Sequence, residues 1–124
     1  MTLVRVHLIA AVVFVAAIVV QVFLAGAAIA NLGGSGNFST HIEFGYTELG
    51  ILALVLLATA LIARRPRREV GIVVLLVVLY VVQTVLPSFK GSTPALAALH
   101  PVNALLLFAV AAWYAWRVWR VTTA

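Results

Sequence analysis

The chain has 124 residues, of which 65% are hydrophobic and only 9% charged, and it contains no cysteine. Soluble domains carry about 25% charged residues, so this composition excludes a water-soluble domain, and the lack of cysteine excludes a disulfide-bonded scaffold. The formal net charge is +5. Because the basic residues flank apolar stretches, this charge indicates membrane topology and does not suggest a nucleic-acid partner.

Four long apolar stretches account for most of the sequence, at about 6–30, 41–63, 70–86 and 94–117. Each has about the 17–25 residues that a helix needs to cross a hydrocarbon core of about 30 Å. None shows the two-residue alternation of a strand, and only helices or closed barrels span membranes. We therefore predict an all-α protein, a four-helix transmembrane bundle with up-down-up-down topology, as a single domain over residues 1–124.

The first apolar stretch follows a single basic residue, Arg5, and holds Gln21 near its far end. It is longer than the roughly 7–15 residues of a signal-peptide core, so we expect it to be retained, although the small residues at 25–27 leave cleavage open. His7 is expected to lie at the membrane interface. The glycine-rich segment 33–37 then predicts a flexible loop.

The second helix is predicted to start at Thr40, because Thr40 and Glu43 have the spacing of a capping box. His41 would then lie in the first turn, and Gly45 and Glu48 follow on the same helical stripe. An ionisable residue inside a membrane span suggests a functional site. We therefore expect Glu48 to face the interior of the bundle and to have a partner there.

A basic hairpin at 64–69, which contains Pro66, ends the second helix and turns the chain. The third helix carries Gln83 and is predicted to stop at Pro87. Seven of the eight basic residues lie at the N-terminus, in this hairpin and at the C-terminus: Arg5, Arg64, Arg65, Arg67, Arg68, Arg117 and Arg120. The positive-inside rule therefore predicts a multi-pass protein of the cell membrane with both termini in the cytoplasm.

The fourth helix carries His100 and, on the same face, Asn103. Pro101 removes the hydrogen bond to the Ala97 carbonyl, so we expect a kink near this position. Aromatic residues at the far end of the helix are predicted to form an interfacial belt: Trp113, Tyr114, Trp116 and Trp119.

The two halves of the chain repeat one pattern, in which a glutamine late in one helix is followed by a histidine early in the next. His41 comes 20 residues after Gln21, and His100 comes 17 residues after Gln83. This predicts an internal two-fold repeat of helices 1–2 and 3–4. Counting the helical rise from the basic residues places Gln21, Gln83, Glu48 and His100 in one polar layer, with His41 about 9 Å above His100.

Two histidines on alternate helices of a bundle suit the axial positions of a b-type haem. We predict His41 and His100 as the ligands of the haem iron, with a supporting shell of Gln21, Gly45, Glu48, Gln83 and Asn103. The alternative is a packing or assembly subunit of a membrane complex, in which the histidines and glutamines only form interhelical hydrogen bonds. A metal ion or a quinone-like ligand also stays open.

The sequence holds no nucleophile–base pair, phosphate loop or zinc-binding spacing. We therefore favour a redox carrier or accessory protein over an enzyme. The expected partners are the lipid bilayer, a quinone or a larger redox complex, and a second copy of the chain.

Two stretches resemble a small actinobacterial family of membrane proteins of unknown function: His41-Ile42-Glu43-Phe44-Gly45 and Leu99-His100-Pro101-Val102-Asn103-Ala104. The layout is also distantly similar to one four-helix half of haem A synthase, in which histidines of the second and fourth helices ligate haem near the outer face. This similarity implies axial roles for His41 and His100. The synthase has a glutamate just before its helix-2 histidine, whereas Glu43 and Glu48 follow His41 here. Haem conversion is therefore not implied.

Overall fold

The computed structural model describes residues 2–32 and 36–123, and within these ranges every regular element is a helix. Four helical spans are long and apolar enough to cross a membrane: Leu3–Ile29, Ser39–Ile62, Arg67–Gly91 and Pro94–Thr122. The predicted all-α, four-helix transmembrane fold is therefore confirmed. Of the loop predicted at 33–37, residues 33–35 lie outside the described residues.

The first span is one helix, α1 (Leu3–Ile29), which contains no proline and a single glycine near its end. It ends in a Schellman motif, in which Asn31 adopts a left-handed φ of 54° and the Leu32 N–H donates to the Ala27 carbonyl at 2.9 Å. Asparagine tolerates this conformation better than most residues. The motif satisfies the last carbonyls of α1 and turns the chain back towards the second span.

The second span consists of two helices, α2 (Ser39–Tyr46) and α3 (Glu48–Ile62), with a break at Thr47. The predicted capping box is wrong, because α2 already begins at Ser39 and the side chain of Asn37 accepts a hydrogen bond from the Ser39 N–H at 3.0 Å. The helix therefore starts two residues earlier than a Thr40 cap requires, and Thr40 lies within α2.

The third span begins directly after Pro66 with α4 (Arg67–Val85) and continues as a short 3₁₀ helix, η1 (Leu86–Gly91). The α-helix ends at Val85, two residues before Pro87 and close to the predicted stop, but the span continues as η1. Proline at the first turn of a helix loses no hydrogen bond, and Pro87 lies in the first turn of η1. The chain therefore changes from an α-helix to a 3₁₀ helix between Val85 and Leu86.

The fourth span consists of α5 (Pro94–Ala97) and α6 (Leu99–Thr123), separated by a turn at Ala98. A break in this region is what Pro101 predicts, because its ring nitrogen cannot donate to the Ala97 carbonyl. The consequence for the site is that His100 lies in the first turn of α6, close to the break.

The bundle packs with two-fold regularity. Helix α1 packs against α3 and α6, and α4 packs against the same two helices, as the predicted internal repeat requires. Many small side chains line these contacts, and the largest fully buried apolar side chains fill the space between them: Phe14, Leu56, Leu76, Val73 and Val118. Small residues allow close approach of helices in a membrane, where packing replaces the hydrophobic effect as the main attraction.

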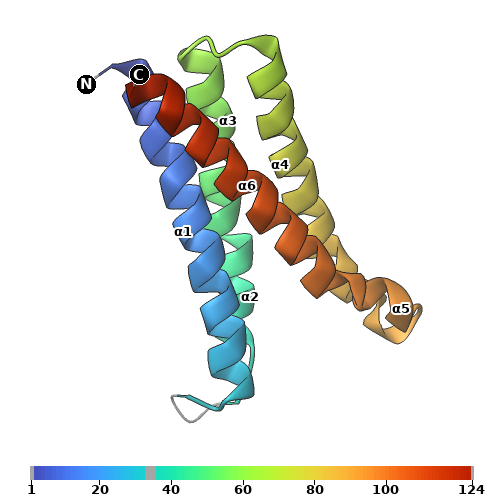
Figure 1. Cartoon of the computed structure of the whole chain (residues 1–124). Helices are drawn as coiled ribbons and strands as arrows, with labels where there is room; N and C mark the ends of the chain where they lie inside the picture. Colours follow the sequence, from blue (N-terminus) through green and yellow to red (C-terminus); the bar gives the residue numbers. More distant parts are fainter. Residues whose placement is uncertain (1, 33–35, 124) are drawn as a thin grey trace.

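Figure 1 shows both termini and the α3–α4 turn at one end of the molecule. At this end the two hairpins lie close together. Towards the opposite end the α1–α2 hairpin and the segment around α5 diverge, because α4 and α6 run at an angle to α1. The repeated glutamine and histidine residues lie in this diverging half.

Candidate functional site: a cleft between two glutamine–histidine pairs

A cleft of about 180 Å³ lies between the two hairpins in the diverging half of the bundle. Most of its lining is apolar, and its polar lining includes both glutamine–histidine pairs: Gln21, His41, Gln83 and His100. Pockets for drug-sized ligands usually have volumes of about 300–1,000 Å³. The cleft therefore has room for a small ring or for part of a larger flat molecule.

In the first pair, Gln21 of α1 holds His41 of α2 at both its ring and its backbone. His41 Nδ1 lies 3.0 Å from the Gln21 carbonyl oxygen, and the Gln21 amide donates to the His41 carbonyl at 2.9 Å. Because a backbone carbonyl can only accept, Nδ1 must carry the ring proton. His41 Nε2 therefore keeps its lone pair, with the Gln21 amide nitrogen 3.4 Å away.

The second pair repeats this arrangement. His100 Nδ1 lies 3.0 Å from the Gln83 carbonyl oxygen, and the Gln83 amide nitrogen lies 3.0 Å from Nδ1 and 3.2 Å from Nε2. A carbonyl can only accept and an amide N–H can only donate, so both contacts are satisfied when Nδ1 carries the proton and Nε2 accepts from the amide. Asn103 orients this amide, because its side-chain N–H groups donate to Gln83 Oε1 at 2.7 Å and to the Leu79 carbonyl at 2.9 Å. His100 thus has the same tautomer as His41.

The two imidazoles come together across the cleft, with ring centroids 6.3 Å apart and ring planes inclined by 78°. The predicted depth difference of about 9 Å between His41 and His100 is therefore wrong. That prediction counted the rise along straight, parallel helices, whereas α6 is inclined to α1 and α2 in Figure 1. Inclination brings residues of unequal depth to the same level.

Glu48 does not belong to this site. Its side chain is exposed and does not line the cleft, so the expected inward orientation is wrong. The break at Thr47 ends the helical stripe that His41 and Gly45 share, and Glu48 opens a new helix. A carboxylate in the first turn of α3 is favourable because it meets the positive end of the helix dipole.

Gly45 lines the cleft and leaves room for Gln21. A Cβ atom at position 45 would lie 2.6 Å from Gln21 Nε2, closer than real Cβ contacts. Tyr80, which was not anticipated, spans the two hairpins: its hydroxyl lies 3.1 Å from the Gly45 carbonyl oxygen and 3.2 Å from that of Tyr46. These carbonyls come just before the break at Thr47, so Tyr80 caps the end of α2.

The two pairs differ in one respect. Gln83 Oε1 accepts from Asn103, but Gln21 Oε1 is buried and has no hydrogen-bond partner among the described residues. The residue three positions after His41, where Asn103 follows His100, is Phe44. The repeat is therefore chemically asymmetric, and the cleft offers one free acceptor.

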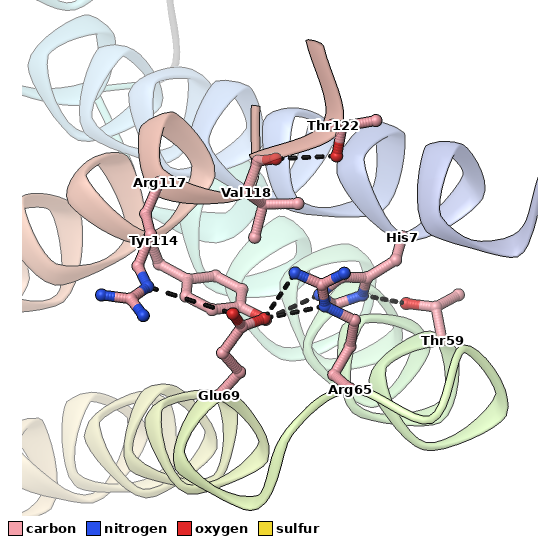
Figure 2. Close-up of polar contacts among 8 residues, drawn as sticks. All are labelled: His7, Thr59, Arg65, Glu69, Tyr114, Arg117, Val118 and Thr122. Carbon is pink, nitrogen blue, oxygen red and sulfur yellow. Dashed lines mark hydrogen bonds and ion pairs between the residues drawn. The ribbon is translucent and has the colours of Figure 1, made fainter. Parts of the chain in front are cut away.

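A second polar cluster, at the end that carries the termini, was not predicted (Figure 2). His7 and Tyr114 are both 0% exposed, so both side chains face the interior of the bundle and Tyr114 is not part of a lipid-facing aromatic belt. The Tyr114 hydroxyl donates to His7 Nε2 at 2.7 Å, and His7 Nδ1 donates to Thr59 Oγ1 at 2.9 Å. Thr59 in turn donates to the Leu56 carbonyl at 3.0 Å, which fixes the direction of the chain of hydrogen bonds.

Charged residues border this cluster. Glu69 of α4 is 5% exposed, and its Oε2 accepts from Nε and Nη2 of Arg65, both at 2.7 Å. Arg117 of α6 is an ion-pair neighbour only, since its Nε lies 4.0 Å from Glu69 Oε1 and has no hydrogen-bond partner among the described residues. Counting from the arginines at this end would have found the cluster, because His7, Thr59 and Tyr114 all lie two to five residues from one.

The two polar regions are well separated. His7 and Gln21 are 14 positions apart on α1, a rise of about 21 Å. The buried residues of α1 between them are apolar: Ala10, Ala11, Phe14, Ala17 and Ile18. The chemistry of the cleft is therefore independent of the cluster at the termini.

The described residues contain no group of three or more histidine, cysteine, aspartate or glutamate side chains that could hold a bare metal ion. What the cleft offers instead is a pair of imidazoles, each with one nitrogen tied to a backbone carbonyl and the other available. Each Nε2 carries a lone pair and faces only a glutamine amide, so the two atoms can accept a hydrogen bond from a ligand, or coordinate a metal whose other ligands come with it.

Comparison with known proteins gave one match. No curated protein and no solved structure is significantly similar to the chain. A family of unknown function (DUF6220) matches residues 21–89, more than half of the chain, which includes Gln21, His41 and Gln83 and leaves out His7 and His100. The chain therefore belongs to the DUF6220 family, whose function is unknown.

Proposed function

We propose that this protein holds a b-type haem between His41 and His100 and stores or transfers electrons in the membrane. The observation that carries the proposal is the position of the two imidazoles in one cleft. His41 and His100 line the same cleft from different helices, so a flat metal-containing group between them could take one nitrogen from each ring. The centroids of His41 and His100 are 6.3 Å apart.

The hydrogen bonds of both histidines support the same reading. Metal-bound histidine normally donates its other N–H to a carbonyl or carboxylate, which fixes the tautomer and the orientation of the ring. His41 and His100 each donate from Nδ1 to the backbone carbonyl of their glutamine, so both Nε2 atoms are available as ligands. The Gln21 and Gln83 amide groups, 3.4 and 3.2 Å from these atoms, would rotate aside on binding.

The cleft also suits a flat, apolar group. Haem supplies four of the iron ligands itself, so it needs only two histidines from the protein. The cleft of about 180 Å³ encloses only part of a macrocycle, and the remainder would extend between the diverging hairpins. Gly45, which lines the cleft, adds no side chain to obstruct it.

When bound, haem supplies one-electron chemistry, and the residues of this chain hold and orient it. His41 and His100 would be the ligands, and the backbone carbonyls of Gln21 and Gln83 would fix their ring orientation. The layout that resembles one half of haem A synthase agrees with these roles. A quinone or a larger redox complex in the membrane would be the exchange partner, and the arginine-rich end would face the cytoplasm.

The second candidate is a packing or assembly subunit. The glutamine–histidine contacts favour it, because they already occupy both histidines with interhelical hydrogen bonds. Such bonds contribute about 0.6 kcal/mol each in membranes, enough to stabilise a bundle without a cofactor.

The absorption spectrum of the purified protein separates the two candidates. Protein produced with ample haem and reduced with dithionite should show the Soret and α bands of low-spin, six-coordinate haem at one haem per chain. His41→Ala and His100→Ala should each remove the low-spin bands, whereas Glu48→Gln, on the exposed side, should keep them. Folded protein without a Soret band would refute haem binding and leave the packing role.

A further inference from the structure

All three tryptophans of the chain lie in the last part of α6, at the end that carries the termini: Trp113, Trp116 and Trp119. Their side chains are 44%, 49% and 54% exposed. Tryptophan at the end of a membrane span sits at the level of the lipid headgroups, because its ring is apolar and its N–H is polar. This surface of α6 therefore lies where headgroups and acyl chains meet.

Two arginines lie over two of these rings. The Arg117 guanidinium carbon is 5.9 Å from the centre of a Trp113 ring, and that of Arg120 is 5.2 Å from a Trp116 ring. The four residues have the spacing i, i+3, i+4 and i+7, which places them on one face of a helix. We call this face the arginine–tryptophan stripe, and it is defined by Trp113, Trp116, Arg117 and Arg120.

The positive charge of the stripe is only partly balanced within the described residues, because Arg117 has one acidic neighbour, with its Nε 4.0 Å from Glu69 Oε1, and Arg120 has no ion pair. Arg117 Nε is buried without a hydrogen-bond partner, and Glu69 is already bonded to Arg65 (Figure 2). The Arg117 side chain is 35% exposed, and Arg120 is exposed. A guanidinium has several N–H donors in one plane and pairs best with a carboxylate or a phosphate.

We propose that the arginine–tryptophan stripe binds the headgroup phosphate of an anionic phospholipid. Arg117 and Arg120 donate to the phosphate, and the flat faces of Trp113 and Trp116 contact the glycerol and the upper acyl chain. The charge is complementary, and the position at the end of a membrane span puts the arginines at phosphate level. The proposal does not depend on haem binding, because the cleft lies about 21 Å away along the bundle.

The tryptophans themselves report on this surface, because none lies elsewhere in the chain. The full-length protein is placed in bilayers of phosphatidylcholine mixed with brominated phosphatidylglycerol, or of phosphatidylglycerol mixed with brominated phosphatidylcholine. Bromine quenches tryptophan on contact, so the two series give the relative affinity of the stripe for each lipid. One basic residue near an anionic surface contributes about a fivefold preference, so we expect phosphatidylglycerol to be favoured about fivefold or more.

The matched variants are Arg117→Gln/Arg120→Gln and Arg67→Gln/Arg68→Gln. Both lose two charges at the same end of the molecule, but only the first pair lies on the stripe, and Arg67 and Arg68 are exposed on α4. We expect the first variant to lose the preference and the second to keep most of it. An equal loss in both would mean attraction to the whole charged end and would overturn the proposal.

Two further outcomes would also overturn it. Equal quenching by both lipids in the unmodified protein would show that the stripe does not select anionic lipid. Protection from both lipids would show that a second copy of the chain covers the stripe.

A competition experiment tests whether the stripe binds free phosphate instead of lipid. Soluble glycerol phosphate at millimolar concentration should leave the quenching unchanged. Its displacement of phosphatidylglycerol would assign the stripe to a free phosphate ligand instead.

Discussion

The hydrogen bond from Tyr114 to His7 offers a direct measure of how strongly the buried cluster holds the bundle together. Tyr114→Phe keeps the ring and removes only the hydroxyl, so it leaves no large cavity between α6 and α1. His7 Nε2, which accepts from that hydroxyl at 2.7 Å and has no contact with solvent, would lose its donor.

Leaving a buried polar atom unpaired costs about 1–3 kcal/mol in soluble proteins. Measured interhelical bonds in membranes average about 0.6 kcal/mol and reach about 1.7, because the unfolded chain in a membrane also finds partners. The 2.7 Å length and full burial place this bond near the upper end of the membrane range. We therefore expect Tyr114→Phe to lower the free energy of unfolding by about 1–2 kcal/mol.

The assay is reversible unfolding of the full chain in mixed detergent micelles, followed by helical circular dichroism. A double-mutant cycle with His7→Leu isolates the pair, because Tyr114→Phe should cost little once His7 is gone. The reasoning is refuted if Tyr114→Phe is neutral in the unmodified protein, or if its cost is the same with His7 present and absent.

Two further predictions concern the cleft and the topology. Gly45→Ala places a Cβ atom 2.6 Å from Gln21 Nε2, so the Gln21 side chain must move away from His41, and we expect a loss of about 0.6–1.7 kcal/mol, the range of an interhelical hydrogen bond in a membrane, in the same unfolding assay. Gly26→Ala is its matched control, since nothing lies within 4 Å of a Cβ there, and it should be neutral or slightly stabilising; equal effects of the two changes would contradict the close approach at Gly45. For topology, a reporter that works only in the cytoplasm should be active when it is fused to the C-terminus. Activity of a reporter that works only in the periplasm, fused at the same position, would reverse the proposed orientation.

The spans could be predicted from sequence because each is a long apolar stretch with few charges, a property that depends on composition alone. The repeat also singled out Gln21, His41, Gln83 and His100, but the direct contact of Gln21 with His41 was not predicted, because the depth count placed His41 above Gln21. The orientation of Glu48 could not be predicted in this way. It depends on the break at Thr47, where the Tyr80 hydroxyl reaches the Gly45 and Tyr46 carbonyls from another helix.

The buried cluster at the termini was missed for a related reason. His7 looked unpartnered because its partners are distant in sequence, with Thr59 52 positions away and Tyr114 107 positions away. Tyr114 looked like a member of an aromatic belt because it lies next to Trp113. Helical geometry separates these neighbours by about 100°, so one faces lipid and the other faces the core. Sequence adjacency is thus a poor guide to which side chain of a transmembrane helix is buried.

An apolar layer separates the polar cluster around His7 from the cleft around Gln21. Along α1, the buried side chains between the two polar regions offer neither a donor nor an acceptor over about 21 Å. An ion or a proton would therefore find no polar side chain to bind along this stretch of the helix. A ligand of the cleft must therefore enter and leave through the leaflet opposite the termini, or sideways from the lipid. If the cleft holds a redox group as proposed, its exchange partner is expected to meet the protein in the half of the membrane opposite the termini.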